Sequence, residues 1–124
     1  MKIAVVGSYG VGMTMRIPQL PQAGETLMGG EFDAGPGGKG SNQAIGAARL
    51  GAEVSFLTAI GPDDFGVAAR ALWKDEGVDY SCVITGKGHT MVGFILVESD
   101  GENRIIVAAG ALDELTMTTN GSRL

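Results

Sequence analysis

The sequence predicts an α/β protein in which a parallel sheet of apolar strands is joined to a separate antiparallel β element. Short apolar runs at residues 2–7 and 54–60, each followed by a segment with helical character, indicate the parallel sheet. Asp100-Gly101 lies between the apolar runs 91–97 and 104–108, a pattern typical of a β-hairpin. A doubly wound sheet needs about five or more strands, and this chain supplies about three. We therefore expect an incomplete sheet.

The first third of the chain predicts one regular strand followed by irregular structure. Residues 2–7 end in a glycine and have the uninterrupted apolar pattern of a strand buried on both faces. Residues 8–24 contain three glycines and two prolines and predict a loop. Residues 25–34 predict an irregular or bulged strand, because two adjacent glycines interrupt them.

Two helices are predicted from their end signals. The first covers about 41–50, with Ser41 or Asn42 as its N-cap and Gly51 just beyond its C-terminus. The second covers about 64–76, where Asp63 and Asp64 predict capping, although paired carboxylates also allow a catalytic role. The spacing i, i+3, i+4, i+7 predicts that this helix buries Phe65, Ala68, Ala69 and Leu72.

Composition narrows the class of protein. The 124 residues correspond to about one domain, and the net charge of −5, without a basic cluster, argues against nucleic-acid binding. No apolar run approaches the roughly 18 residues of a membrane helix, so no membrane partner is expected. The single Cys82 excludes an internal disulfide and favours a reducing, cytoplasmic location; we expect it to be a small core residue.

The stretch at residues 35–44, Gly-Pro-Gly-Gly-Lys-Gly-Ser-Asn-Gln-Ala, is the strongest indication of a binding site. Glycines let a backbone approach a ligand closely, and a helix start presents unpaired N–H groups. Lys39 and Asn42 add an ammonium and an amide, which suits a polar or anionic small molecule. A tight turn with a helix cap would explain the glycines but would leave Lys39 and Asn42 without a role.

The same stretch formally matches the dinucleotide fingerprint at Gly35, Gly37 and Gly40. That fingerprint should directly follow the first strand, and here it lies about thirty residues beyond it. The acidic residue expected after the second strand is also missing, although Asp63 lies close. A Rossmann-type dinucleotide-binding domain remains the weaker alternative.

Three separated motifs together resemble one family. They are Pro21-x-x-Gly24-Glu25-Thr26 leading to Gly37-Gly38-Lys39-Gly40-Ser41-Asn42-Gln43-Ala44 and Arg49-Leu50-Gly51-Ala52; Gly61-x-Asp63-x-Phe65-Gly66; and Gly101-Glu102-Asn103-Arg104-Ile105 running to Gly110-Ala111. In this order they resemble the N-terminal part of the ribokinase-like sugar kinases, the PfkB carbohydrate kinase family.

The resemblance implies a ribokinase-like fold with a three-layer α/β/α core, of which residues 1–112 form the N-terminal half only. It implies a small β-sheet lid built from segments near 12–35 and 90–109, and a homodimer through such lids. It also implies phosphoryl transfer from ATP, with Mg²⁺, to a sugar-like alcohol. Residues 113–124 are expected to form a frayed polar tail.

Carried over by position, the resemblance implies that Gly38, Lys39 and Asn42 contact substrate hydroxyls, with Gly40 and Ser41 in the same turn. The family usually carries Asn-x-Asp after the first strand, where this chain has Gly10 and Gly12. Loss of that carboxylate should weaken the binding of ribose by about 1.5–3 kcal/mol. A different or bulkier substrate, or a weakened site, follows as a hypothesis.

The family's catalytic aspartate, anion-hole glycines and nucleotide pocket belong to its C-terminal half, so no catalytic or metal-binding residue is expected in this chain. We therefore expect the 124 residues to be a fragment or truncated product that is inactive alone. The leading alternative is a non-catalytic sugar-binding or dimerisation module built from the same half-domain.

Overall fold

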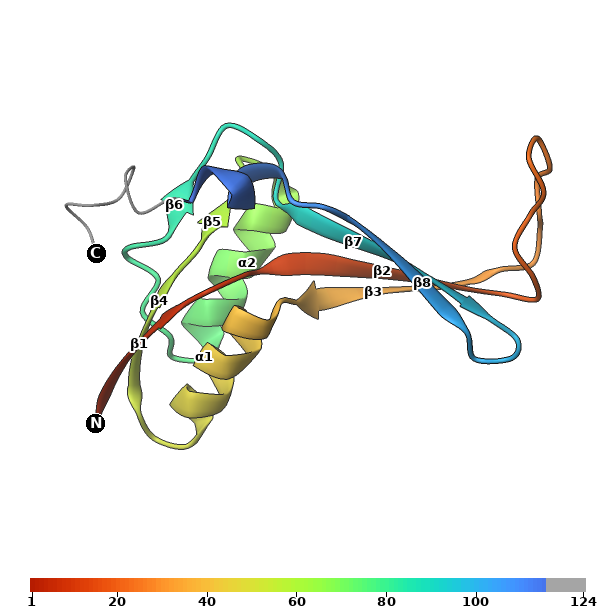
Figure 1. Cartoon of the computed structure of the whole chain (residues 1–124). Coiled ribbons are helices and arrows are strands. Elements are labelled where there is room, and N and C mark those ends of the chain that lie inside the picture. The colour runs from red at the N-terminus through yellow and green to blue at the C-terminus, as the bar shows by residue number, and fades with distance from the viewer. Residues whose placement is uncertain (116–124) are drawn as a thin grey trace.

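The computed structural model describes residues 1–115, which form an α/β core from which a four-stranded sheet projects (Figure 1). In chain order the elements are β1 (Lys2–Val6), β2 (Gly10–Ile17), β3 (Glu31–Gly37), α1 (Lys39–Arg49), β4 (Glu53–Leu57), β5 (Ala59–Ile60), α2 (Asp64–Asp75), β6 (Ile84–Thr85), β7 (Met91–Glu98), β8 (Asn103–Ala108) and the 3₁₀ helix η1 (Gly110–Glu114). No helix in this part of the chain is long and apolar enough to cross a membrane.

The core contains parallel strands, as predicted. β1 pairs in parallel with β4, and β5 pairs in parallel with β6. The predicted strand at 54–60 is divided at Thr58, whose hydroxyl is buried without a hydrogen-bond partner among residues 1–115. The expectation that β1 is buried on both faces is wrong. Alternate residues of β1 are exposed, because both described helices pack against the same face of β1 and β4.

Trp73 of α2 is the centre of the core. Its side chain is fully buried, and the rings of Tyr9 and Phe56 meet it edge-to-face at centroid distances of 5.2 and 5.3 Å. The predicted helix at 64–76 is confirmed, but its buried residues are Gly66, Ala69 and Trp73. Ala68 is exposed, because α2 turns a neighbouring stripe towards the sheet.

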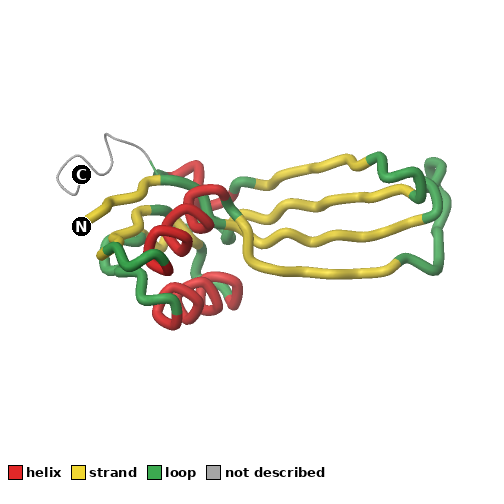
Figure 2. The backbone as a smooth tube through the Cα atoms, turned by 90° about the horizontal axis from the view of Figure 1, so that it is seen from below, coloured by secondary structure: helices red, strands yellow, loops and turns green. Residues whose placement is uncertain are grey.

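The projecting sheet, called the lid sheet below, extends away from the helices (Figure 2). Its strand order is β3-β2-β7-β8. β7 and β8 form the predicted antiparallel hairpin, and β2 pairs in parallel with β7 and antiparallel with β3. The loop predicted over residues 8–24 is therefore partly wrong. Residues 10–17 form a central strand, because pairing on both edges outweighs the turn preference of its glycines.

The ends of the helices agree with the sequence only in part. α1 begins at Lys39, two residues before the predicted start, and Gly38 rather than Ser41 or Asn42 occupies the N-cap, without a side-chain cap. At the other end Gly51, with φ of +97°, donates its N–H to Ala48, and Ala52 donates to Ala47. This is the Schellman arrangement that a glycine beyond a helix predicts.

Cys82 and the predicted polar tail differ from what the sequence predicts. Cys82 is exposed and not a core residue. The predicted polar tail begins inside η1, since Asp113 and Glu114 belong to that helix, and Glu114 accepts hydrogen bonds from the N–H groups of Lys87 and Gly88. The remainder of the predicted tail, residues 116–124, lies outside the described residues.

Candidate functional site

The candidate site is built where the turn between β3 and α1 packs against the connection between β1 and β2. Gly38 has φ of +99°, and a Cβ there would lie 2.5 Å from the Ser8 carbonyl oxygen and 2.7 Å from the Tyr9 Cα. A Cβ at Gly40 would lie 2.7 Å from the Cα of Gly7. At these two positions glycine is required by the close approach of two backbone segments, in addition to any approach of a ligand.

The start of α1 is partly satisfied by the protein itself. The N–H of Ser41 donates to the Ser8 carbonyl at 3.0 Å, and the N–H of Asn42 donates to Gly38 at 3.0 Å. The Ser41 hydroxyl accepts a hydrogen bond from the indole Nε1 of Trp73 at 3.0 Å, and Ser41 is only 1% exposed. The side chain of Ser41 thus anchors α1 to α2 and does not point towards solvent.

Lys39 and Asn42 have the opposite environment. Both lie in the first turn of α1 and are exposed. Within residues 1–115 neither side chain makes an ion pair or a hydrogen bond to another residue. Their ammonium and amide groups are exposed in the first turn of α1, and the role in ligand binding that the sequence predicts for them stays a prediction.

Gly10 and Gly12 lie next to this turn in β2. Gly10 pairs with Gly37 on one side and with Met91 on the other, while Gly12 pairs with Gly35. A Cβ at Gly12 would meet Ile95 Cδ1 at 3.8 Å, which is an ordinary contact. The structure therefore brings the predicted positions Gly10, Gly12 and Gly38–Asn42 into one region, although they come from separate segments.

A hydrogen-bond network fastens the lid sheet to the core beside this region. Asp63 caps α2 by accepting from the N–H of Gly66 at 2.9 Å, and it also accepts from the N–H and hydroxyl of Thr90 at 2.8 and 2.7 Å. The Thr90 hydroxyl in turn accepts from the N–H of Gly61 at 2.9 Å. Thr90 immediately precedes β7, so the network fixes the base of that strand.

The same network acts on the charge of Asp63. Partial burial tends to raise the pKa of its carboxyl, but the hydrogen bonds from Thr90 and Gly66 outweigh this and hold the pKa below its ordinary value. Capping by Asp63 was predicted from the sequence, and the structure confirms it. Its second partner, Thr90, was missed, because a contact across 27 residues leaves no local signal.

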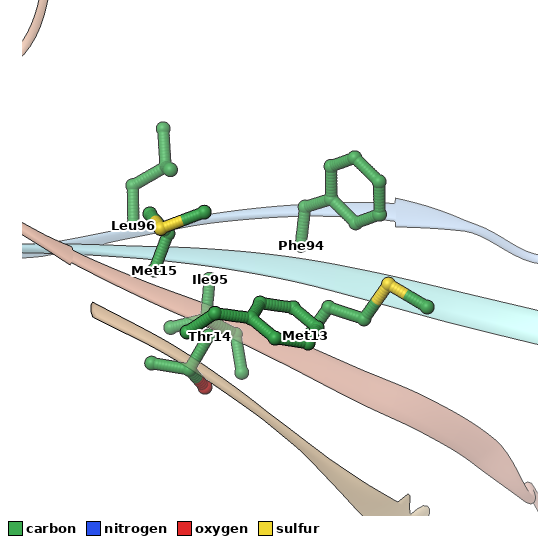
Figure 3. A pocket seen from close by; sticks show the side chains of 7 residues that line it. Met13, Thr14, Met15, Phe94, Ile95 and Leu96 are labelled. Carbon is green, nitrogen blue, oxygen red and sulfur yellow. The ribbon is translucent and has the colours of Figure 1, made fainter. Parts of the chain in front are cut away.

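The lid sheet is hollowed beside its apolar side chains. A depression of about 280 Å³ is lined mainly by apolar side chains of β2 and β7 (Figure 3). Its lining residues are Met13, Thr14, Met15, Phe32, Phe94, Ile95 and Leu96. Phe32, Phe94 and Ile106 of the lid sheet are 63%, 54% and 68% exposed. Such an exposed apolar patch is typical of an interaction surface.

Among residues 1–115 there is no group of three or more His, Cys, Asp or Glu side chains placed to hold a metal ion. The site offers an ammonium, an amide and backbone groups, and it therefore suits neutral hydroxyls or an anion.

Comparison with known proteins identifies the class. The model of the pfkB family of carbohydrate kinases matches residues 2–121, so the chain belongs to that family. The region corresponds to the N-terminal portion of the ribokinase-like fold.

Particular relatives agree with this assignment. The chain is 41% identical over 117 residues to the ribokinase of Bacillus subtilis and 42% identical over 117 residues to that of Schizosaccharomyces pombe. These matches cover 92% and 88% of this chain but only 39% and 36% of the relatives. The chain thus spans about two fifths of the length of the curated relatives it matches.

Solved structures show the same relationship. The structure of ribokinase from Giardia lamblia superposes with a TM-score of 0.86 at 30% identity, covering 98% of this chain and 40% of that one. The structure of Arabidopsis thaliana ribokinase complexed with ribose and ATP superposes with a TM-score of 0.76 at 35% identity, covering 87% and 36% of the two chains.

Proposed function

We propose that this chain carries the sugar-binding half and the lid of a carbohydrate kinase, in which Lys39 and Asn42 bind hydroxyls of a sugar-like alcohol. The observation that carries the proposal is the position of these two unengaged polar side chains, at the point where α1, the Gly38 turn and the lid sheet meet. The Rossmann-type alternative loses its basis, because the glycine stretch follows lid strand β3 and not β1.

The chemistry of the site suits a polyol. An ammonium donates up to three hydrogen bonds, and an amide both donates and accepts, which matches hydroxyls that do both. Of the other positions expected in this site, Gly38 and Gly40 would act by close approach of their backbone. Ser41 would act by holding the turn in place, since its hydroxyl is occupied by Trp73.

In the proposed reaction ATP is the phosphoryl donor and Mg²⁺ is its counter-ion. We assign the catalytic aspartate, the anion hole and the nucleotide site to the part of the kinase fold that this chain does not span. The chain alone is then expected to release no ADP from ATP in the presence of a sugar. Detectable ADP release that disappears in Lys39→Ala would contradict this.

Sugar binding is tested directly by recording amide NMR shifts of the labelled 124-residue chain during titration with ribose and other sugars. We expect shifts at Gly38, Lys39 and Asn42. The variants Lys39→Ala and Asn42→Ala should abolish them, whereas Gln43→Ala, which truncates the neighbouring exposed amide, should not. Equal shifts in all three variants would rule out this site.

A homodimer through the lid sheet is the second part of the proposal. The exposed apolar face around Phe32, Phe94 and Ile106 supports it, since a matching copy would remove these side chains from water. The alternative of a non-catalytic dimerisation module shares this surface. Sedimentation with and without sugars separates the two, because a dimer that does not respond to any sugar favours the module.

A cytoplasmic location is also proposed, and the exposed free thiol of Cys82 suits a reducing compartment.

A further inference from the structure

Met91 lies across Gly10 at the edge of the candidate site. The two residues are partners in the parallel pair of β2 and β7, so their substituents point to the same face of the lid sheet. A Cβ at Gly10 would lie 2.5 Å from the Cε of Met91, 3.1 Å from its Cβ and 2.9 Å from its carbonyl oxygen. The Met91 side chain therefore occupies the space into which a side chain at residue 10 would project.

This arrangement changes the chemistry beside the Gly38 turn. Gly10 pairs on its other side with Gly37, which directly precedes Gly38, so Met91 lies across β2 from the Gly38 turn. Thioether sulfur is a weak acceptor and no donor, and methionine adapts its shape to apolar surfaces. The neighbouring position Gly12 adds no polar group either, and the closest side-chain atom to a Cβ there is Ile95 Cδ1.

We propose that Met91 is a specificity-determining residue of the sugar site, and that it selects a sugar-like alcohol lacking a hydroxyl on the carbon that faces β7. The inference rests on the proposed function, because it requires a sugar to bind at Lys39 and Asn42. A hydroxyl placed against the thioether loses water and gains at most a weak acceptor, whereas a C–H group loses no hydrogen bond. A deoxy sugar should therefore bind about tenfold more tightly than the corresponding fully hydroxylated sugar.

The experiment is an NMR titration of the 124-residue chain with ribose, 2-deoxyribose and 3-deoxyribose. We expect one of the deoxy sugars to bind about tenfold more tightly than ribose. Met91→Gln, which replaces the thioether by an amide of similar length, should remove this preference, and Met91→Leu, which stays apolar, should retain it. Met28→Gln makes the polar change at a methionine that is 83% exposed and serves as the matched control.

The outcomes distinguish this inference from the proposed function. Shifts at Lys39 and Asn42 with ribose binding at least as tightly as both deoxy sugars would overturn the role of Met91 and leave the sugar site intact. A deoxy preference that survives in Met91→Gln would also overturn it. Absence of shifts at Lys39 and Asn42 with every sugar would overturn both the site and the inference.

Discussion

The hydrogen bond between Ser41 and Trp73 gives the sharpest test of how the site is supported. The indole Nε1 donates to the Ser41 hydroxyl at 3.0 Å, and the two residues are 0% and 1% exposed. Ser41→Ala would leave a buried N–H without an acceptor, which costs about 1–3 kcal/mol of unfolding free energy. With a urea dependence of about 1–3 kcal/mol per molar, the unfolding midpoint should fall by roughly 1 M.

A double-mutant cycle shows whether this cost belongs to the pair. In Trp73→Phe the donor is absent, so adding Ser41→Ala should cost less than about 0.5 kcal/mol. Ser55→Ala, which removes an exposed hydroxyl near Asp79, should change stability by no more than about 0.5 kcal/mol and is the control. Urea unfolding followed by far-UV circular dichroism measures all variants without depending on the fluorescence of the tryptophan.

Equal costs of Ser41→Ala in both backgrounds would refute the reasoning, because the hydroxyl would then stabilise the fold without its indole partner. A Ser41→Ala variant with unchanged stability and lost sugar binding would instead show that Ser41 contacts the sugar directly. The structure predicts the reverse, namely a loss of stability with sugar contacts retained wherever the chain remains folded.

Gly40→Ala should lower the unfolding free energy by about 1–3 kcal/mol, since its Cβ would overlap backbone. In the same helix a Cβ at Gly46 would meet nothing within 4 Å, so Gly46→Ala should raise the unfolding free energy by about 0.5–1 kcal/mol. Thermal unfolding measures both variants. Equal effects at the two sites would contradict the packing at Gly40. Because the pKa of Asp63 is lowered from 3.8, its stabilisation is fully present above that pH and is lost as the pH falls through the lower folded value. Asp63→Asn should therefore lose less unfolding free energy than the parent chain as the pH falls below about 4. The same pH dependence of unfolding free energy in both proteins would refute this. Phe94→Glu should shift sedimentation towards monomer, whereas Val67→Glu, at an exposed position of α2, should not. A dimer that persists in Phe94→Glu would exclude the apolar face of the lid sheet as its interface.

Features specified by neighbouring residues were predictable from the sequence. The Asp100-Gly101 pair predicts the β7–β8 hairpin, Gly51 predicts the end of α1, and Asp63 predicts the start of α2, all because turn and cap geometry depends on a few adjacent residues. The family motifs also predict Lys39 and Asn42 as site residues; the structure shows both exposed, and their binding role stays a prediction.

Features specified by distant partners were not predictable. The glycines of β2 resemble those of a loop until β3 and β7 pair with both edges of the strand. In the sequence, Ser41 suits either a helix cap or a contact with a ligand. Its structural role depends on the hydrogen bond from Trp73, which is 32 residues away. Met91 looks like an ordinary strand residue, and its position over Gly10 follows from the register of a parallel pair that no local pattern reveals.

The parallel pairing of β2 with β7 also has a consequence for the order of folding. The contact from Ser99 to the Pro18 carbonyl joins residues 81 positions apart, and both helices and the core strands β4, β5 and β6 lie between the two paired strands in the sequence. Such non-local pairing forms slowly. At about 5–20 residues per second of synthesis, the apolar strand with Met13 and Met15 would wait on the order of ten seconds for β7. During that interval the edge of β2 that later pairs with β7 stays open, and an open strand edge can pair with another chain and aggregate.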